Sequence, residues 1–145
     1  MAGPPIPAGE SVVRHCRARE LFLVSGTPTA VNASAFALRL NEDGLSVDRL
    51  EFFGGDRAHR LDCVRSITKL GVRRSYRMAV LGVDEVRGIE LSPGVSANVE
   101  INLDPSRALP PNFNAAHALI GPVDPLQDIA VRELFSFIAT LEDYA

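Results

Sequence analysis

Apolar residues recur in this sequence at two different spacings, and the order of those spacings limits the folds open to the chain. Several short stretches alternate apolar and polar residues, as half-buried strands do, and residues 98–103 are the clearest of them. Helical spacing occurs in two stretches, one after Asp56 and one after Asp124. Because strands come in runs and do not alternate singly with helices, the pattern predicts an α+β fold.

The expected strands are separated by residues that favour turns. They cover residues 11–16, 20–24, 34–40, 45–47, 78–83, 98–103 and 115–120. Residues 25–28 read Ser-Gly-Thr-Pro and mark a turn, and residues 41–44 read Asn-Glu-Asp-Gly and join two strands into a hairpin over 34–48. Three prolines between Leu103 and Phe113 predict an extended loop.

Both helical stretches carry a signal at their start. Asp56 can cap a helix that runs to about Leu70, with Gly71 just after its end. Asp124 can cap a second helix over about residues 124–141, since Pro125 suits its first position. The apolar stripe of the first helix is Leu61, Val64, Ile67 and Leu70, and the face of the second that should pack on the sheet is Ile129, Leu134, Phe137 and Ile138.

The expected architecture is a single α+β domain over residues 11–145, preceded by a disordered lead at residues 1–10. It has an antiparallel or mixed sheet and two main helices on one face, the C-terminal one packed on the sheet. The first ten residues contain three prolines and lack the form of a signal peptide. With no membrane-spanning run and two cysteines, Cys16 and Cys63, we expect a cytoplasmic protein with free thiols.

Basic residues are concentrated in the first part of the chain. Residues 1–80 hold 12 Arg and Lys against 8 Asp and Glu, and residues 81–145 hold 3 against 10. The densest basic run lies late in the first helix and after it, and consists of Arg65, Lys69, Arg73, Arg74 and Arg77. Cations at a helix C-terminus favour the helix dipole, and a nucleic-acid-binding surface is the alternative interpretation.

The sequence contains none of the motifs that hold a cofactor. Gly54-Gly55 is not followed by Gly-Lys-Ser or Gly-Lys-Thr, no Gly-x-Gly-x-x-Gly occurs, and the cysteines and histidines lack metal-ligand spacing. We therefore expect neither a cofactor nor a metal. Cys16 is an unsuitable nucleophile with its neighbour as base, because adjacent strand residues point to opposite faces.

Two of the three histidines, His15 and His117, fall in expected strands. If they met in space they could act as general base and general acid of a small hydrolase or nuclease, with Arg14 stabilising a phosphate charge. The competing interpretation is that each is a buried structural histidine bonded to the backbone. The sequence leaves both open, because only distance decides between them.

Four short segments read SVVRHC, AFALR, LSVDRLE and NAAHALI, at residues 11–16, 35–39, 45–51 and 114–120. In this order they resemble a family of small uncharacterised bacterial proteins. That family has Trp where Arg49 stands and Pro-Ser where Ala115-Ala116 stand. The resemblance implies a continuous fold from Ser11 to the last helix and no mechanism. It singles out His15, Cys16, Ser46, Glu51 and His117 as the residues to test.

These observations favour a small bacterial accessory protein that binds another protein through a sheet edge or a helix face and has no catalysis of its own. A conventional core and the lack of a cofactor or metal motif support this hypothesis. The two alternatives are the His15 and His117 hydrolase and the nucleic-acid-binding module. No membrane association is expected.

Overall fold

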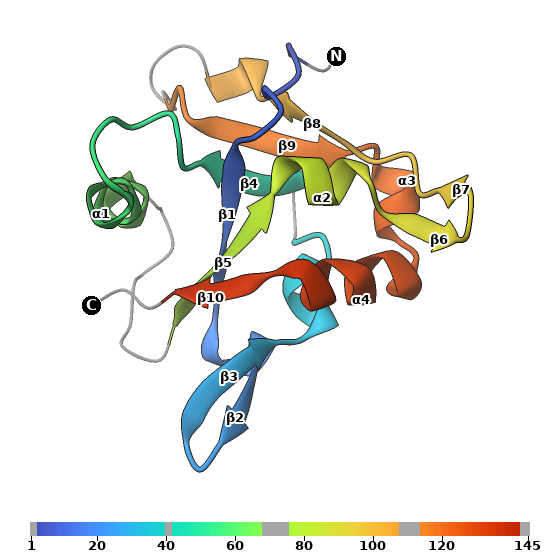
Figure 1. Cartoon of the computed structure of the whole chain (residues 1–145), viewed down its shortest axis with the longest axis horizontal. Helices are drawn as coiled ribbons and strands as arrows, with labels where there is room; N and C mark the ends of the chain where they lie inside the picture. The colour runs from blue at the N-terminus through green and yellow to red at the C-terminus, as the bar shows by residue number, and fades with distance from the viewer. Residues whose placement is uncertain (1–2, 40–41, 68–75, 108–113, 143–145) are drawn as a thin grey trace.

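The computed structural model of the chain describes residues 3–39, 42–67, 76–107 and 114–142. These residues form one α+β domain, as the pattern of strands and helices predicts. Its main sheet has six strands in the order β10-β5-β1-β4-β9-β8, and every neighbouring pair is antiparallel (Figure 1). The strands are β1 (Ser11–Cys16), β4 (Leu45–Arg49), β5 (Arg77–Gly82), β8 (Glu100–Leu103), β9 (His117–Gly121) and β10 (Thr140–Glu142).

Two hairpins lie outside the main sheet. One pairs β2 (Leu21–Val24) with β3 (Thr27–Val31), and the other pairs β6 (Glu90–Ser92) with β7 (Val95–Ser96). The α-helices are α1 (Arg57–Ile67), α2 (Val83–Arg87), α3 (Val123–Leu126) and α4 (Ile129–Ile138). Between successive described strands lie the 3-10 turns η1 (Ala18–Glu20), η2 (Ala33–Phe36) and η3 (Pro105–Arg107). No helix within these described ranges is long and apolar enough to cross a membrane.

The two faces of the main sheet are covered by different helices, α1 on one face and α4 on the other. Side chains alternate between the faces along a strand, so the neighbours of β5 residues show which helix covers which face. Met78 of β5 packs in a small cluster with Val64 of α1. Leu81 of the same strand, three residues on, belongs to the larger core together with Phe135 of α4. The expectation that both helices share one face is therefore wrong, although the C-terminal helix does pack on the sheet.

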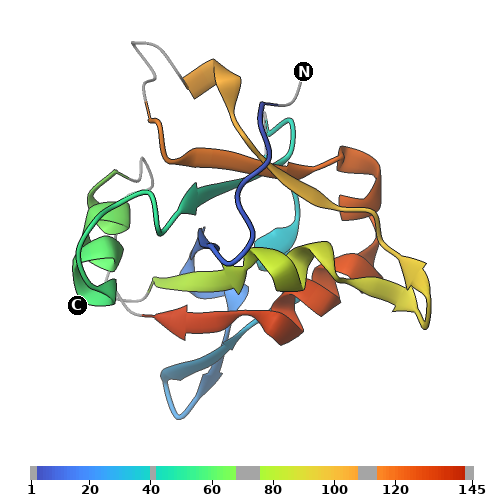
Figure 2. The ribbon, with the colours of Figure 1, turned by 45° about the horizontal axis from the view of Figure 1, so that its top comes forward.

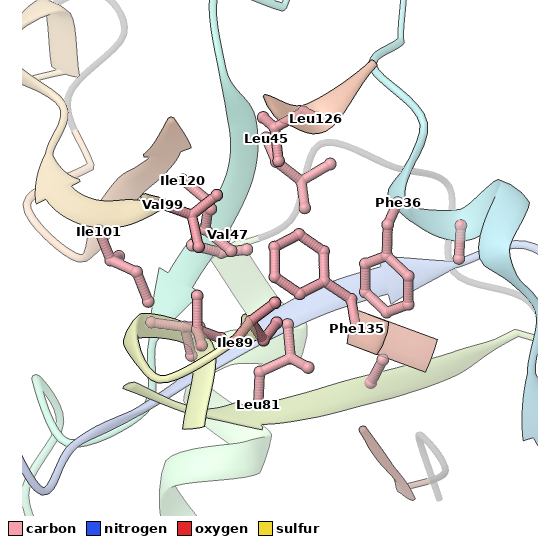
Figure 3. Packing of buried hydrophobic residues seen from close by; sticks show 14 of the residues in the cluster. Phe36, Leu45, Val47, Leu81, Ile89, Val99, Ile101, Ile120, Leu126 and Phe135 are labelled. Atoms are coloured by element: carbon pink, nitrogen blue, oxygen red, sulfur yellow. The ribbon is translucent and has the colours of Figure 1, made fainter. Parts of the chain in front are cut away.

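The larger core is centred on two aromatic rings, Phe36 of η2 and Phe135 of α4. Their centroids lie 5.6 Å apart with the planes at 68°, an edge-to-face arrangement (Figure 3). Figure 3 shows aliphatic side chains from the sheet around them, among them Leu45, Val47 and Leu81. This contact joins the segment after the β2–β3 hairpin to the C-terminal helix.

The strand expected at residues 34–40, and with it the hairpin over 34–48, is not formed. The side chain of Asn32 accepts a hydrogen bond from Ser34 N and starts the 3-10 turn η2. Ala35 and Phe36 lie in this turn, and both are fully buried in the larger core. The other half of that hairpin does exist, but as β4, which pairs with β1 and β9.

The C-terminal helix begins four residues later than the sequence predicts. Asp128, and not Asp124, accepts a hydrogen bond from Ala130 N at 2.9 Å, and α3 is a separate short turn. The helix also ends earlier, because the chain leaves it at Ala139 and continues into β10.

The face of α4 that packs on the core also differs from the predicted one. Val131 and Phe135 are buried, and Leu134 and Ile138 pack against the same core, which is the i, i+3, i+4, i+7 pattern of one helix face. Phe137 lies outside this stripe and is 87 % exposed, and Ile129 is 55 % exposed. The prediction that Ile129 and Phe137 pack on the sheet is therefore wrong, whereas Leu134 and Ile138 do face the core.

Residues 3–10 belong to the domain and do not form the expected disordered lead. Ile6 N donates to Ile101 O at 2.9 Å, and Pro5 forms a β-bridge with Asn102. The Ile6 side chain is fully buried in the larger core. A segment rich in proline can still line a sheet edge, because proline needs only to be placed where its missing N–H is not required.

The first helix matches its prediction where the structure describes it. Asp56 Oδ1 accepts a hydrogen bond from His59 N at 2.9 Å, as an N-cap does, and Val64 is fully buried. The expected end at Leu70 and Gly71 lies outside the described residues.

Replacing Phe135 by Ala should lower the free energy of unfolding by roughly 3–5 kcal/mol, because it removes a buried aromatic ring from the core. Replacing Phe137 by Ala, two residues along the same helix, should change it by less than about 0.5 kcal/mol. Urea denaturation of the two variants measures both values. Equal costs would mean that α4 packs by a different face.

Candidate functional site

Strand β1 places Arg14 and His15 on opposite faces of the main sheet. Val13 packs in the cluster under α1, whereas Val12 and Cys16 lie in the larger core, so alternation puts His15 with Val13 and Arg14 with Val12. The arrangement in which Arg14 would stabilise a phosphate beside His15 and His117 is therefore not formed.

Arg14 is completely buried, and each of its five N–H groups has an acceptor. Three go to backbone carbonyls: Nε to Ala35 O at 3.0 Å, Nη1 to Ser46 O at 3.0 Å and Nη2 to Ala37 O at 3.2 Å. The other two reach the carboxylate of Glu42 at 2.7 and 3.2 Å. Arg14 thus ties β1 to β4 and to the segment after η2, and it has no donor left for a ligand.

The Glu42 carboxylate is held in its charged form by this arrangement. Burial works against the charge, but the hydrogen bonds and the charge of Arg14, together with the N–H groups of Arg39 and Ser46, lower the pKa of Glu42 to about 2. Burial lowers the pKa of Arg14, and the Glu42 carboxylate opposes that effect. The pair is a bidentate, buried ion pair.

His15 and His117 lie on the other face of the sheet, on the two strands that flank Asp48. His15 Nε2 lies 3.2 Å from Asp48 Oδ2, and Asn114 Nδ2 donates to Asp48 Oδ1 at 3.1 Å. Asp48 and His117 are directly opposite each other in the β4–β9 ladder. His117 Nδ1 lies 2.9 Å from Asp104 Oδ2, close but poorly aligned for a hydrogen bond. We call these five residues the histidine–carboxylate cluster.

The histidine–carboxylate cluster is largely closed to solvent. His15 is 8 % exposed and His117 is 9 % exposed. Burial lowers the pKa of His117, against the opposing charges of Asp48 and Asp104, and Arg107 adds to the lowering. The His117 ring is therefore neutral near pH 7, as a structural histidine in a buried polar network is.

The remaining residues singled out by the family resemblance hold the fold together. Glu51 Oε2 accepts a hydrogen bond from Ser11 N at 2.7 Å. Ser46 contributes its backbone N–H to Glu42 and its carbonyl to Arg14. Burial raises the pKa of the Cys16 thiol to about 12, so this thiol is not a nucleophile near neutral pH.

The second cysteine, Cys63, lies on α1, and its Sγ is 3.5 Å from His59 Nε2. Cys16 lies in the larger core and Cys63 on the helix that covers the opposite face, and both thiols are free. Within the part of the chain that the structure describes, no group of three or more His, Cys, Asp or Glu side chains could hold a metal ion.

The basic run is described only at its two ends. Arg65 lies 3.0 Å from Asp62 in an ion pair along α1, and Arg77 Nη1 donates to Tyr76 O at 2.8 Å. Lys69, Arg73 and Arg74 lie outside the described residues. The nucleic-acid alternative therefore stays a prediction.

One apolar surface that the sequence pattern did not single out lies on the β2–β3 hairpin. Phe22 and Leu23 are each 57 % exposed and Val24 is 61 % exposed, and all three belong to β2. The β2–β3 hairpin projects from the body of the domain in both views (Figures 1 and 2). A signal was present, since the segment reads Leu-Phe-Leu-Val without the alternation of a half-buried strand.

A groove of about 650 Å³ lies at the base of this hairpin. It is bordered by the residues that lead into β2 and by those that follow β3: Arg17, Arg19, Glu20, Ser34, Ala37, Leu38 and Arg39. A second groove of about 620 Å³ lies beside β8 and β9 and includes Asp104 but neither histidine. Neither of these two grooves opens onto His15 or His117.

Comparison of the chain with protein-family models, with curated proteins and with solved structures finds no match. What the chain does is therefore inferred from its own residues.

Replacing Glu42 by Gln should lower the free energy of unfolding at pH 7 by roughly 3–5 kcal/mol, because it leaves the Arg14 charge buried without a counter-ion. The pKa of Glu42 falls from 4.5 to about 2 on folding, so its contribution is complete above pH 4.5 and is lost as the pH falls towards 2. Denaturation at a series of pH values should show that the free energy of unfolding of the wild type falls between pH 4.5 and 2, and that it falls less in Glu42→Gln. The exposed neighbour Asp43, replaced by Asn, is the control.

The lowered pKa of His117 makes the free energy of unfolding depend on pH in a range above that of Glu42. The folded ring binds its proton less readily than the unfolded ring, whose pKa is 6.5, so the free energy of unfolding should fall as the pH drops below 6.5. His117→Gln should reduce this slope and lower the melting temperature, whereas His59→Gln, at an exposed position of α1, should do neither. An unchanged melting temperature with lost turnover on an RNA or phosphodiester substrate would favour the two-histidine enzyme.

Proposed function

We propose that the chain is an accessory protein of the bacterial cytoplasm that binds another protein through the β2–β3 hairpin and has no catalysis of its own. The observation that carries the proposal is the exposure of Phe22, Leu23 and Val24, three consecutive apolar residues that are each more than half exposed. A run of this kind is unfavourable on the surface of a free monomer unless it serves a contact.

The backbone of β2 supports the same proposal. Among the described strands, β2 hydrogen-bonds with β3 alone, so its other edge carries unpaired N–H and C=O groups. The β3 side of the hairpin is approached by the C-terminal segment, since Ser136 Oγ of α4 donates to Val31 O. An extended partner segment can add to the β2 edge, where main-chain hydrogen bonds give affinity and alternating side chains give specificity.

The side chains of β2 are arranged for a partner on both faces of the hairpin. Phe22 and Val24 point to one face and Leu23 to the other, because strand residues alternate. A protein that pairs with the edge would cover apolar surface above and below the new strand. Burying one such side chain contributes about 1.5–3 kcal/mol, so three of them supply a substantial part of a binding free energy.

Two observations weigh against the enzyme alternative with His15 and His117. Arg14 lies on the other face with all its donors occupied. Both histidine side chains are about nine-tenths buried. A general acid or base must come within hydrogen-bonding distance of its substrate, which requires an opening to solvent.

A photo-reactive benzophenone side chain at position 23, introduced in cells of the native host, tests the proposal. We expect it to form a covalent product with one partner protein on irradiation. Position 91 is the matched control, because Leu91 is 47 % exposed and lies on the other hairpin, β6–β7. Products that are the same at both positions, or that contain only this chain, would contradict the proposal.

The captured protein, once purified, should bind the wild-type chain and lose affinity for Leu23→Thr by tenfold or more, since a tenfold change corresponds to 1.4 kcal/mol. Leu91→Thr should bind as the wild type does. Because Leu23 is exposed, Leu23→Thr should change the free energy of unfolding by less than about 0.5 kcal/mol, so the loss of binding is not a loss of fold.

A further inference from the structure

The groove at the base of the β2–β3 hairpin has an excess of positive charge. Three arginines, Arg17, Arg19 and Arg39, border it, and Glu20 is the one acidic side chain among its lining residues. Arg17 and Arg19 come directly before β2, and Arg39 follows η2, so both ends of the hairpin bring guanidinium groups to the same place. Three cations in one groove repel one another unless an anion lies between them.

The Glu20 carboxylate does not supply that anion for all three. It is buried, its Oε1 accepts from Arg17 N at 2.7 Å, and the same atom lies 3.2 Å from Arg39 Nη2. Within the described residues, no carboxylate lies in ion-pair distance of the guanidinium of Arg17 or Arg19. The Arg39 Nε atom is buried and lacks a hydrogen-bond partner there. The groove therefore holds more donors than acceptors.

We propose that this groove binds acidic side chains of the partner segment that pairs with β2. The inference rests on the proposed function and adds the chemistry of the partner to it. A guanidinium group binds a carboxylate through two parallel hydrogen bonds. Two or three neighbouring arginines can therefore each bind an acidic side chain in this way. The partner segment thus combines apolar residues, which contact Phe22, Leu23 and Val24, with Asp or Glu at one end.

The spacing along the chain sets where those acidic residues stand. Arg19 precedes the first residue of β2 by two positions, and Arg17 by four. An added strand advances about 3.3 Å per residue, in step with β2. The chain between Arg17 and Leu21 forms the 3-10 turn η1, which rises only about 2 Å per residue, so a segment that continues past Leu21 reaches the arginines within about three residues. The acidic residues are therefore expected immediately beside the apolar part of the partner segment.

Charge also argues against two other occupants of this surface. A second copy of the chain, paired antiparallel through β2 about a twofold axis, would place the arginines of each copy beside the hairpin of the other, and residues 21–31 contain no Asp or Glu to receive them. A nucleic acid would gain from the arginines, but the whole chain carries a net charge of −3, and the adjacent surface of β2 is apolar. An acidic protein segment satisfies both the groove and the hairpin.

Three synthetic seven-residue peptides serve as probes for fluorescence anisotropy with the full chain. Each has a Val-Thr-Val-Thr-Val core, followed by Glu-Glu, Gln-Gln or Lys-Lys. We expect the Glu-Glu peptide to bind at least tenfold more tightly than the Gln-Gln peptide, and the Lys-Lys peptide to bind most weakly. Added salt should narrow the difference between Glu-Glu and Gln-Gln, because partly exposed charges are screened.

The variant Arg17→Gln with Arg19→Gln should abolish the preference for Glu-Glu and leave Gln-Gln binding unchanged. Arg57→Gln is the matched control, since this arginine lies on α1 with half of its side chain exposed. Leu23→Thr should weaken all three peptides by the same factor. The preference is a difference between two peptides on one variant, so a small loss of stability does not imitate it.

The outcomes separate the two proposals. Equal binding of the Glu-Glu and Gln-Gln peptides, with both weakened by Leu23→Thr, overturns the acidic-segment inference and leaves the hairpin proposal standing. Failure of every peptide to bind overturns both. Binding of inorganic phosphate or a single-stranded oligonucleotide that is stronger than that of the Glu-Glu peptide, and that is lost in the Arg17 and Arg19 variant, overturns the inference in favour of a phosphate ligand.

Discussion

The buried ion pair between Arg14 and Glu42 determines how the rest of this structure is arranged. Arg14 points from the centre of the sheet into the side that holds the larger core. Three of its donors bind carbonyls, two in the segment that follows the β2–β3 hairpin and one in β4, and the other two bind Glu42. A guanidinium buried so completely is tolerated only when every donor is occupied. The position of η2, and with it Phe36, follows from that requirement.

The same interaction explains why part of the fold could be predicted from sequence and part could not. Strands β1, β5, β8 and β9 and the start of α1 follow from local alternation and a capping Asp56, and each lies close to its predicted place. The segment 34–40 also alternates, but Arg14, 21 residues away from Ala35, binds its carbonyls, and Asn32 starts a 3-10 turn. In α4, the cap is Asp128 and not the predicted Asp124, and the buried aromatic ring is Phe135 and not Phe137.

The candidate sites also depend on contacts between distant residues, which local sequence patterns do not show. Asp48 contacts His15 and lies opposite His117, and that place is set by the β4–β9 register and not by any local motif. The hairpin surface was visible as four apolar residues in a row, but only its projection from the domain distinguishes it from a buried strand. The arginine groove joins residues some 20 positions apart, 17–20 and 34–39, and no spacing rule connects them.

The open edge of β2 has a consequence for the life of the protein in the cell. An apolar strand with unpaired backbone groups is a template for any other extended chain, so molecules whose hairpin is uncovered tend to aggregate or to be degraded. On the proposed function, the amount of this protein is then tied to the amount of the protein that covers the hairpin, because an excess of uncovered chain is lost to aggregation or degradation.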